Sequence, residues 1–174
     1  MVDGPIGELT VLAGPAGISR IYFADSTPAQ DPVTRRPLPE LEAQLGRYFA
    51  GELQAFDLDL DPQGTPLQLA VWRRLLAIPY GQTSTYGEVA RQIDESLYDA
   101  GLEPYRRPRV VGAAIGANPL AVIVPCHRVI GSDGSLTGYY GGLERKRTLL
   151  ELEGLAVSGD SVRTAPSRQQ LAML

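Results

Sequence analysis

The residues most able to do chemistry lie together in residues 125–130, a segment that holds the only cysteine and the only histidine of the chain. A thiolate at Cys126 would be a nucleophile, and the imidazole of His127 titrates near neutral pH, so it can accept a proton. A free cysteine is also often a small buried apolar residue, and a lone histidine is often structural. If the segment is extended, the two side chains point to opposite sides. We therefore expect any base role of His127 to run through a water molecule.

The counts of cysteine and histidine restrict the chemistry further. A single cysteine excludes an intrachain disulfide. One cysteine with one histidine argues against a Cys/His zinc site within one chain, and nothing in the sequence points to a carboxylate metal site. We therefore expect no metal site, although a carboxylate site is not excluded.

Composition sets the broad class of the protein. The chain has 174 residues, of which 44% are hydrophobic and 21% are charged, as is ordinary for a globular protein of one domain or two small ones. No apolar run approaches the roughly 18 residues of a membrane helix, and the N-terminus lacks the basic and apolar regions of a signal peptide. These features predict a cytoplasmic protein with no membrane partner.

Charge is distributed unevenly along the chain. Residues 1–63 carry 4 basic and 10 acidic residues, whereas residues 64–174 carry 12 basic and 10 acidic ones. Within residues 104–147 the count is 7 basic against 2 acidic. This stretch could face an anion, although a solvated basic face gives the same count.

The first 62 residues predict a small unit of sheet and helix. Residues 8–13 and 17–24 are typical of two strands, and the Gly-Pro-Ala-Gly sequence between them predicts a hairpin turn. Residues 25–39, rich in Pro, Asp and Thr, predict a loop. A helix and a short strand then follow, indicated by Leu41, Leu45 and Phe49 at helical spacing and by the alternation of residues 56–60.

The rest of the chain is expected to be mainly helical, with Asp61-Pro62-Gln63-Gly64 as the domain boundary. Capping signals at Thr65 and at Thr85 with Glu88 predict the starts of two helices. The other expected elements are a helix from Pro108 to Asn118-Pro119, a buried strand at residues 120–124, a helix over residues 143–153 and a frayed tail over residues 157–174. Two short helices followed by a basic strand-and-turn region are compatible with a winged helix-turn-helix.

The chain resembles the O6-alkylguanine-DNA alkyltransferases, also called methylated-DNA–protein-cysteine methyltransferases. The resemblance covers about residues 64–155 and is weaker over residues 1–60. Several motifs in the same order and at matching spacing make it specific. They are residues 65–72, 78–83, 85–90, 109–114, 118–119, 123–130, 138–143 and 149–154.

The resemblance implies an α+β fold and a single reaction that needs no cofactor. A ribonuclease H-like supporting domain would span residues 1–62, a winged helix-turn-helix alkyltransferase domain residues 64–156, and a flexible tail residues 157–174. The thiolate of Cys126 would attack the alkyl carbon on O6 of guanine in DNA and keep the alkyl group as a thioether. Each molecule would therefore act once. His127 would accept the thiol proton through water, and Glu153 would orient His127.

The resemblance also implies how DNA is held. The damaged base must leave the duplex to react. Tyr86 would contact the flipped guanine and the adjacent phosphate and assist the leaving group, and Arg109 would fill the vacated space. The remaining expected residues are Gly112, Ala113 and Arg128 for DNA, and Val129, Tyr139, Tyr140 and Asn118 for the substrate pocket and its support.

The sequence departs from the family pattern at residues 94–108, which lengthen the connection between the two helices of the DNA-binding motif. The first half of this insertion is acidic and the second half is basic. It is either a plain surface loop, a source of phosphate contacts through Arg106 and Arg107, or an acidic segment that tunes affinity. The first domain also lacks the zinc-ligand residues that some members of the family carry.

Three other functions are compatible with parts of this pattern. A non-catalytic module could flip alkylated bases without reacting, a cysteine hydrolase would turn over, and a transcription factor would bind undamaged sites. The expected partner is double-stranded DNA containing O6-alkylguanine, with the protein a monomer. Acceptance of O4-alkylthymine, the range of alkyl groups and cooperative assembly on DNA are left open.

Overall fold

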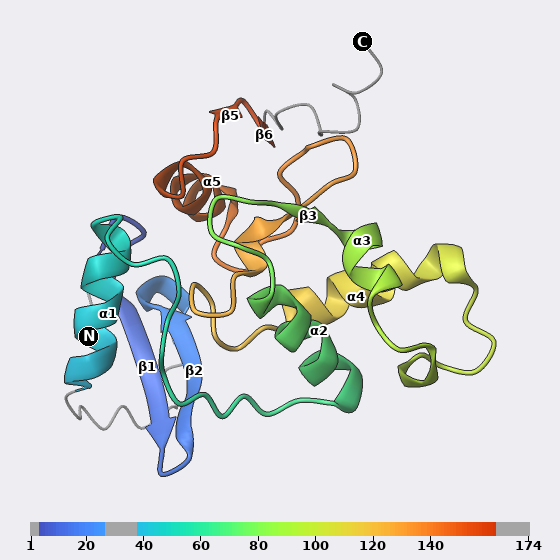
Figure 1. Cartoon of the computed structure of the whole chain (residues 1–174), viewed down its shortest axis with the longest axis horizontal. Coiled ribbons are helices and arrows are strands. Elements are labelled where there is room, and N and C mark those ends of the chain that lie inside the picture. The colour runs from blue at the N-terminus through green and yellow to red at the C-terminus, as the bar shows by residue number, and fades with distance from the viewer. Residues whose placement is uncertain (1–3, 27–37, 163–174) are drawn as a thin grey trace.

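The computed structural model describes residues 4–26 and 38–162. Most of the loop expected at residues 25–39, and residues 163–174 of the expected tail, therefore lie outside the described residues. Figure 1 shows a hairpin and one helix on one side of the molecule and a group of helices on the other. A single cluster of buried apolar side chains, which includes Leu9, Leu45, Val71 and Val111, joins the two sides.

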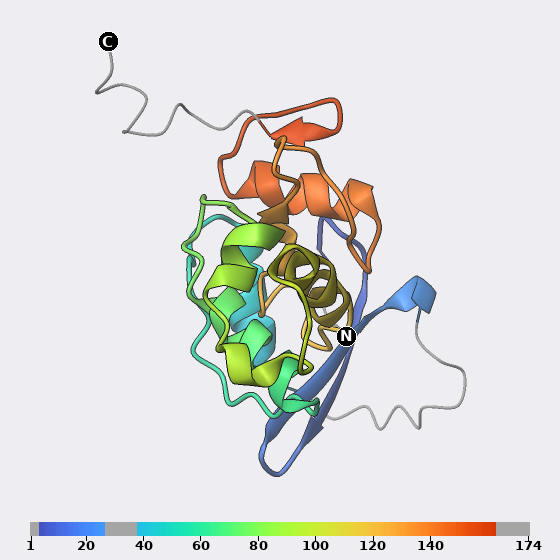
Figure 2. The same cartoon turned by 90° about the vertical axis from the view of Figure 1, so that its right-hand side faces the viewer.

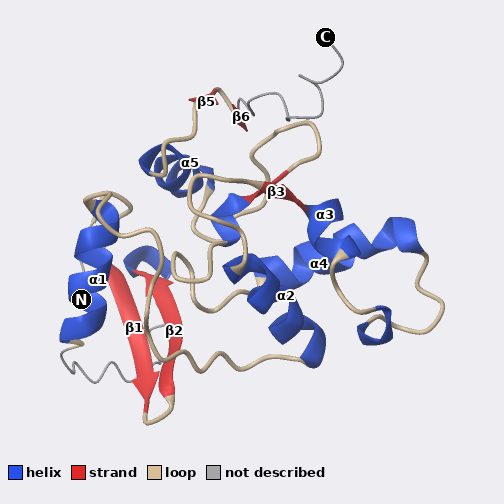
Figure 3. Ribbon diagram, viewed as in Figure 1, coloured by secondary structure: helices blue, strands red, loops and turns tan. Residues whose placement is uncertain are grey.

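The N-terminal part is the hairpin and helix that the sequence predicts. Strands β1 (Leu9–Gly14) and β2 (Gly17–Phe23) pair antiparallel. Helix α1 (Pro39–Phe49) buries Leu41, Leu45 and Tyr48, which recur every three or four residues and therefore form one face. Figure 3 shows α1 beside the two strands.

The short strand expected at residues 56–60 does not form, which corrects that prediction. Only Leu60 pairs, as an isolated parallel bridge to Ile18. The backbone at Asp59 passes very close to Gly17, the first residue of β2. A Cβ on Gly17, whose φ is +139°, would lie 2.4 Å from the carbonyl oxygen of Asp59. The two segments therefore pair at one residue only, and glycine at position 17 is required for this close approach.

Three helices form the centre of the second part. Helix α2 (Pro66–Leu76) begins at a capping box of Thr65 and Gln68, and α3 (Tyr86–Arg91) begins at the predicted box of Thr85 and Glu88. Helix α4 (Arg107–Gly116) packs against both, and Nε1 of Trp72 on α2 donates to the carbonyl of Ala114 on α4 at 2.8 Å. Figure 2 shows these helices in front of the hairpin.

The buried strand expected at residues 120–124 is a tight turn instead. Val122 has φ +76°, an unusual conformation for a β-branched residue. The Asn118 side chain holds the turn, because its oxygen accepts from the amide of Leu120 at 3.0 Å and its nitrogen donates to the carbonyl of Val124 at 2.9 Å. These bonds close the segment into a turn, and Leu120 alone of residues 120–124 pairs with a strand residue, as an isolated parallel bridge to Ile21 of β2.

The turn leads into a short 3-10 helix, η4 (Cys126–Arg128), and then into strand β4 (Val129–Ile130), which pairs parallel with β3 (Ser84–Thr85). Cys126 and His127 are therefore not on an extended segment, and the argument that their side chains must point to opposite sides does not apply.

The chain ends on a helix and a small hairpin. Helix α5 (Leu143–Leu152) precedes strands β5 (Val157–Ser158) and β6 (Ser161–Val162). The frayed tail predicted from residue 157 is therefore wrong for residues 157–162, because Val162 is buried in a cluster with Leu136 and Leu150. The architecture is α+β, and none of the described helices is long and apolar enough to cross a membrane.

Candidate active site

Cys126 begins the 3-10 helix η4 and is almost fully buried, with 4% of its surface exposed. Burial raises the pKa of its thiol, while the hydrogen bond from Asn118 and the charge of Lys146 act in the opposite direction. Nδ2 of Asn118 lies 3.1 Å from the sulfur and is placed to donate to it. The resting group is thus a thiol, which needs a base before it can act as a nucleophile.

His127 is fully buried and is oriented by Glu153. Its Nε2 lies 2.8 Å from Oε1 of Glu153. Because the carboxylate only accepts hydrogen bonds, Nε2 carries the hydrogen and Nδ1 holds the free electron pair. Nδ1 is buried and has no partner among the described residues. Burial lowers the pKa of His127, so the ring is neutral and Nδ1 can take up a proton.

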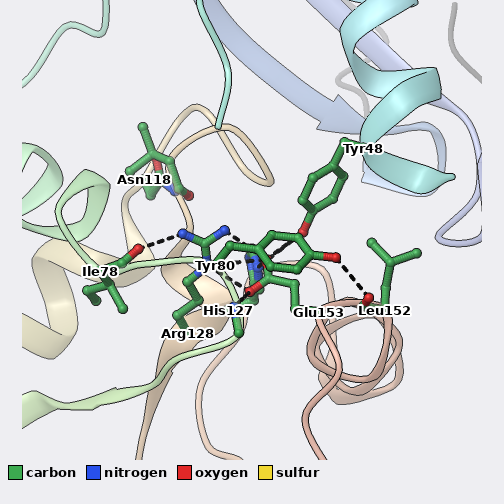
Figure 4. A network of polar contacts seen from close by, with 10 residues as sticks. Tyr48, Ile78, Tyr80, Asn118, His127, Arg128, Leu152 and Glu153 are labelled. Atoms are coloured by element: carbon green, nitrogen blue, oxygen red, sulfur yellow. Dashed lines mark hydrogen bonds and ion pairs between the residues drawn. The ribbon is translucent and has the colours of Figure 1, made fainter. Parts of the chain in front are cut away.

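Glu153 directly follows α5 and is 4% exposed. Figure 4 shows the polar network around it. Oε1 accepts from the Tyr48 hydroxyl at 2.7 Å and from Nη2 of Arg128 at 2.9 Å, and Oε2 accepts from the Gly81 amide at 3.1 Å. Burial raises the pKa of Glu153, but the hydrogen bonds from His127 and Arg128 outweigh it and hold the pKa at about 2. The carboxylate is therefore charged at neutral pH.

Arg128 belongs to this network, which corrects its assignment to DNA. It is 6% exposed, and its Nε lies 2.9 Å from Oε2 of Glu153. Nη1 donates to the carbonyl of Ile78 at 2.6 Å. The guanidinium is thus engaged inside the protein, where it balances the charge of the carboxylate. Nothing in the sequence indicated that Arg128, which directly follows Cys126 and His127, is buried.

Tyr48 belongs to the candidate site, although the sequence did not indicate it. It lies on α1 in the N-terminal part, yet its hydroxyl reaches Glu153. Burial, followed by the nearby charge of Glu153, raises its pKa, so it stays protonated and donates. The sequence shows Tyr48 only as a member of the apolar face of a helix, seven residues after Leu41.

Lys146 is the second residue that was missed. It is fully buried on α5, and its Nζ donates to the carbonyls of Val129 at 2.5 Å and Thr137 at 2.6 Å. Burial lowers its pKa to about 8, while Cys126 acts to raise it. The sequence signal that could have identified Lys146 is its spacing. Lys146 precedes Glu153 by seven residues, or two turns of helix, so the two lie on the same face.

The loop before α5 carries the two predicted pocket tyrosines. Tyr139 has a buried hydroxyl with no partner among the described residues. Burial and the nearness of Cys126 raise the pKa of Tyr139. Tyr140 is 50% exposed. Tyr86 donates from its hydroxyl to the carbonyl of Thr137 at 3.0 Å, which ties this loop to the start of α3.

The remaining predicted DNA residues lie on α4. Arg109 and Ala113 are exposed and Gly112 is half-buried. A Cβ added to Gly112 would lie 3.5 Å from Cδ1 of Tyr86, which is an ordinary van der Waals contact. The opposite face of the helix is buried through Val111 and Ala114. The structure therefore separates an exposed helix surface from the buried group of Cys126, His127, Glu153 and Asn118. No cluster of potential metal ligands occurs in the described ranges.

Two family models match the chain. The model of the 6-O-methylguanine DNA methyltransferase DNA binding domain matches residues 66–155. The model of the ribonuclease-like domain of 6-O-methylguanine DNA methyltransferase matches residues 1–62.

Individual relatives agree with the family models. A methylated-DNA–protein-cysteine methyltransferase of Mycolicibacterium paratuberculosis is 47% identical over 156 residues, covering 87% of this chain and 89% of the relative. A Methanosarcina barkeri protein of the same description is 41% identical over 158 residues, covering 88% and 94%. The crystal structure of Mycobacterium tuberculosis OGT in complex with DNA superposes with a TM-score of 0.76 at 45% identity, covering 88% of this chain and 90% of that one.

Proposed function

Because the chain belongs to the 6-O-methylguanine DNA methyltransferase family, we propose that it repairs O6-alkylguanine in DNA by moving the alkyl group to Cys126. The observation that carries this proposal is the buried arrangement of thiol, imidazole and carboxylate, which supplies a nucleophile, a neutral base and a fixed orientation for that base. No metal or cofactor takes part.

The reaction is a single displacement. Nδ1 of His127 takes the thiol proton through a water molecule, and the hydrogen bond from Nε2 to Glu153 stabilises the imidazolium that forms. The side-chain amide of Asn118 and the charge of Lys146 stabilise the thiolate. Sulfur then bonds to the alkyl carbon while the bond from that carbon to O6 breaks. The electron pair passes to the guanine, which takes up a proton.

The thioether explains why the protein acts once. The step leaves a carbon–sulfur bond that nothing in the site can reverse, so the alkylated protein is the end product. Tyr86 stabilises the leaving guanine by a hydrogen bond or a proton, for which its hydroxyl must turn from the carbonyl of Thr137 to which it donates here. The carbonyl of Val129, which also accepts from Lys146, receives the exocyclic amine of the base.

The exposed face of α4 binds the duplex. Arg109 enters the space that the flipped base leaves, and the small residues Gly112 and Ala113 let the helix approach the minor groove closely. Tyr139 and Tyr140 cover the base in its pocket. The protein would act on duplex DNA as a monomer in the cytoplasm. M. tuberculosis OGT, with its DNA-bound structure, supports DNA as the partner.

The proposed domains divide this work. Residues 64–156 hold the reacting groups and the DNA-binding helix, and residues 1–62 support them. The hydrogen bond from Tyr48 to Glu153 supports this role for the first domain, because it holds the carboxylate that orients the base.

The stoichiometry of transfer tests the proposal. A duplex with one O6-methylguanine, present in excess, should lose one methyl group per protein molecule in a single phase, after which repair stops. Continued repair beyond one methyl group per protein would indicate turnover and would contradict the proposal, as would the absence of any transfer.

A further inference from the structure

The helix that presents Arg109 begins one turn earlier than its α-helical range. A 3-10 helix, η3 (Pro104–Arg106), runs directly into α4, and both Arg106 and Arg107 have helical backbone angles at the junction. The two elements are visible as one continuous helical run in Figure 1. Arg106 therefore stands three residues before Arg109 along one helix, and residues with this spacing share a face.

The shared face is exposed along its length. Arg106, Arg109, Ala113 and Gly116 are all exposed, whereas Val111, Ala114 and Ile115 are buried on the opposite side. Arg106 thus extends by one turn the same face that we propose lies against DNA.

Arg106 is free to bind a ligand and is held in place by its neighbour. Its Nε donates to the hydroxyl of Tyr105 at 3.1 Å, and its guanidinium carbon lies 5.6 Å from the centre of that ring. Tyr105 is 73% exposed, the highest value among the large exposed apolar side chains described. Within residues 4–26 and 38–162, Arg106 has no ion-pair partner.

Arg107 has the opposite arrangement. Its Nη1 lies 2.6 Å from Oε1 of Glu95, and its guanidinium carbon lies 5.0 Å from the ring centre of Tyr98. The hydroxyl of Tyr98 in turn donates to the carbonyl of Ala90 on α3 at 3.0 Å. Arg107 therefore fastens the insertion to the body of the protein, and only Arg106 of this pair is available to a partner.

The acidic part of the insertion limits the size of any contact. Glu95 is neutralised by Arg107, and Asp94 is engaged in capping Ser96. Asp99 and Glu103 are exposed, and no ion pair of either is among those of the described residues. The described residues of the insertion thus form no broad basic patch. The geometry favours a single contact, made by Arg106, with an anionic partner.

We propose that Tyr105 and Arg106 bind one phosphate of the DNA backbone beside the groove that α4 enters. This inference rests on the proposed function. The terminal amino groups of Arg106 match the paired oxygens of a phosphate, and the Tyr105 ring and hydroxyl orient the guanidinium. Such a contact positions the protein on the duplex without reading sequence. The insertion thereby adds an anchor one turn beyond the residue that enters the duplex.

Salt-dependent binding tests this contact. Affinity for a duplex with O6-methylguanine is measured from about 50 to 200 mM salt in a Cys126→Ser background, so that the duplex is not consumed. Loss of one phosphate contact reduces the slope of log affinity against log salt by about 0.9. The ratio of the parent's affinity to that of the Arg106→Ala variant should therefore fall about 3.5-fold across this range of salt concentration.

Matched variants and a second substrate separate this contact from other effects. Arg106→Lys should keep the parent slope, and so should Arg47→Ala, which removes an exposed charge from α1 in the N-terminal part. With Cys126 intact, Arg106→Ala should still accept the alkyl group from a free O6-alkylguanine base at the parent rate. An unchanged slope in Arg106→Ala would overturn the proposal, and so would an equal loss of transfer from duplex and free base. Failure of the parent protein to transfer at all would instead refute the proposed function, and the binding slopes would remain interpretable.

Discussion

Tyr48→Phe isolates the hydrogen bond that links the N-terminal part to the carboxylate of Glu153. The substitution removes one hydroxyl group and keeps the ring, which packs against Phe49 and Phe56 with centres 5.6 and 5.2 Å away. Oε1 of Glu153 retains its bonds from His127 and Arg128, so no buried acceptor is left empty. Any loss of stability therefore reports the hydrogen bond itself.

The expected loss follows from the charge of the acceptor. A hydrogen bond to a charged group contributes about 1.5–3 kcal/mol to stability, and this one is short and fully buried. For a protein of this size, a loss of about 2 kcal/mol corresponds to a fall in Tm of roughly 4–8 °C. Urea unfolding of the parent and the variant at neutral pH gives the free energy directly.

Tyr80→Phe is the matched control for this measurement. The hydroxyl of Tyr80 donates at 2.9 Å to the main-chain carbonyl of Leu152, a neutral acceptor next to the same carboxylate. Its removal should cost only about 1 kcal/mol. If Tyr48→Phe costs no more than Tyr80→Phe, the hydrogen bond to Glu153 does not stabilise the assembled site and the reasoning is refuted.

Three further predictions concern the buried charges. Arg128→Met should destabilise the protein by about 3–5 kcal/mol in urea unfolding, because it leaves Glu153 without its cation, yet the salt slope of DNA binding should not change; a reduced slope would restore Arg128 as a DNA contact. Lys146→Met should raise the pKa of Cys126 and move the pH profile of transfer to higher pH, with roughly tenfold slower transfer at neutral pH for a shift of one pH unit; an unchanged profile would contradict its electrostatic role. The folded-state pKa of Glu153, about 2, lies below the ordinary value of 4.5, so its contribution to stability is present above about pH 4.5 and is lost as the pH falls toward 2. Urea midpoints measured down this range should fall in the parent, and a flat profile would count against the charged carboxylate.

The sequence predicted most elements whose signals are local. The hairpin with its Gly-Pro-Ala-Gly turn, the N-cap at Thr65 and the capping box at Thr85 formed as expected, because their hydrogen bonds lie within a few residues. The strand expected at residues 120–124 failed because the Asn118 side chain closes that segment into a turn. An apolar run of this length fits a buried turn as well as a buried strand.

The candidate site was predicted unevenly for the same reason. The resemblance named Cys126, His127 and Glu153, and their roles stay proposals that the geometry supports. Tyr48 was invisible because its partner, Glu153, lies 105 residues away in sequence. The burial of Lys146 and Arg128 was not predicted, because burial of a cation depends on acceptors that other segments bring in, and composition and periodicity do not report these.

Peptide mass spectrometry shows whether Cys126 itself receives the alkyl group. The protein is incubated with a duplex containing O6-methylguanine, digested and compared with a Cys126→Ala variant treated in the same way. One added methyl group is expected on the peptide that contains Cys126, and none anywhere in the variant. An unmodified Cys126 peptide from protein that binds the damaged duplex tightly would contradict the proposed transfer and indicate a module that flips the base without reacting.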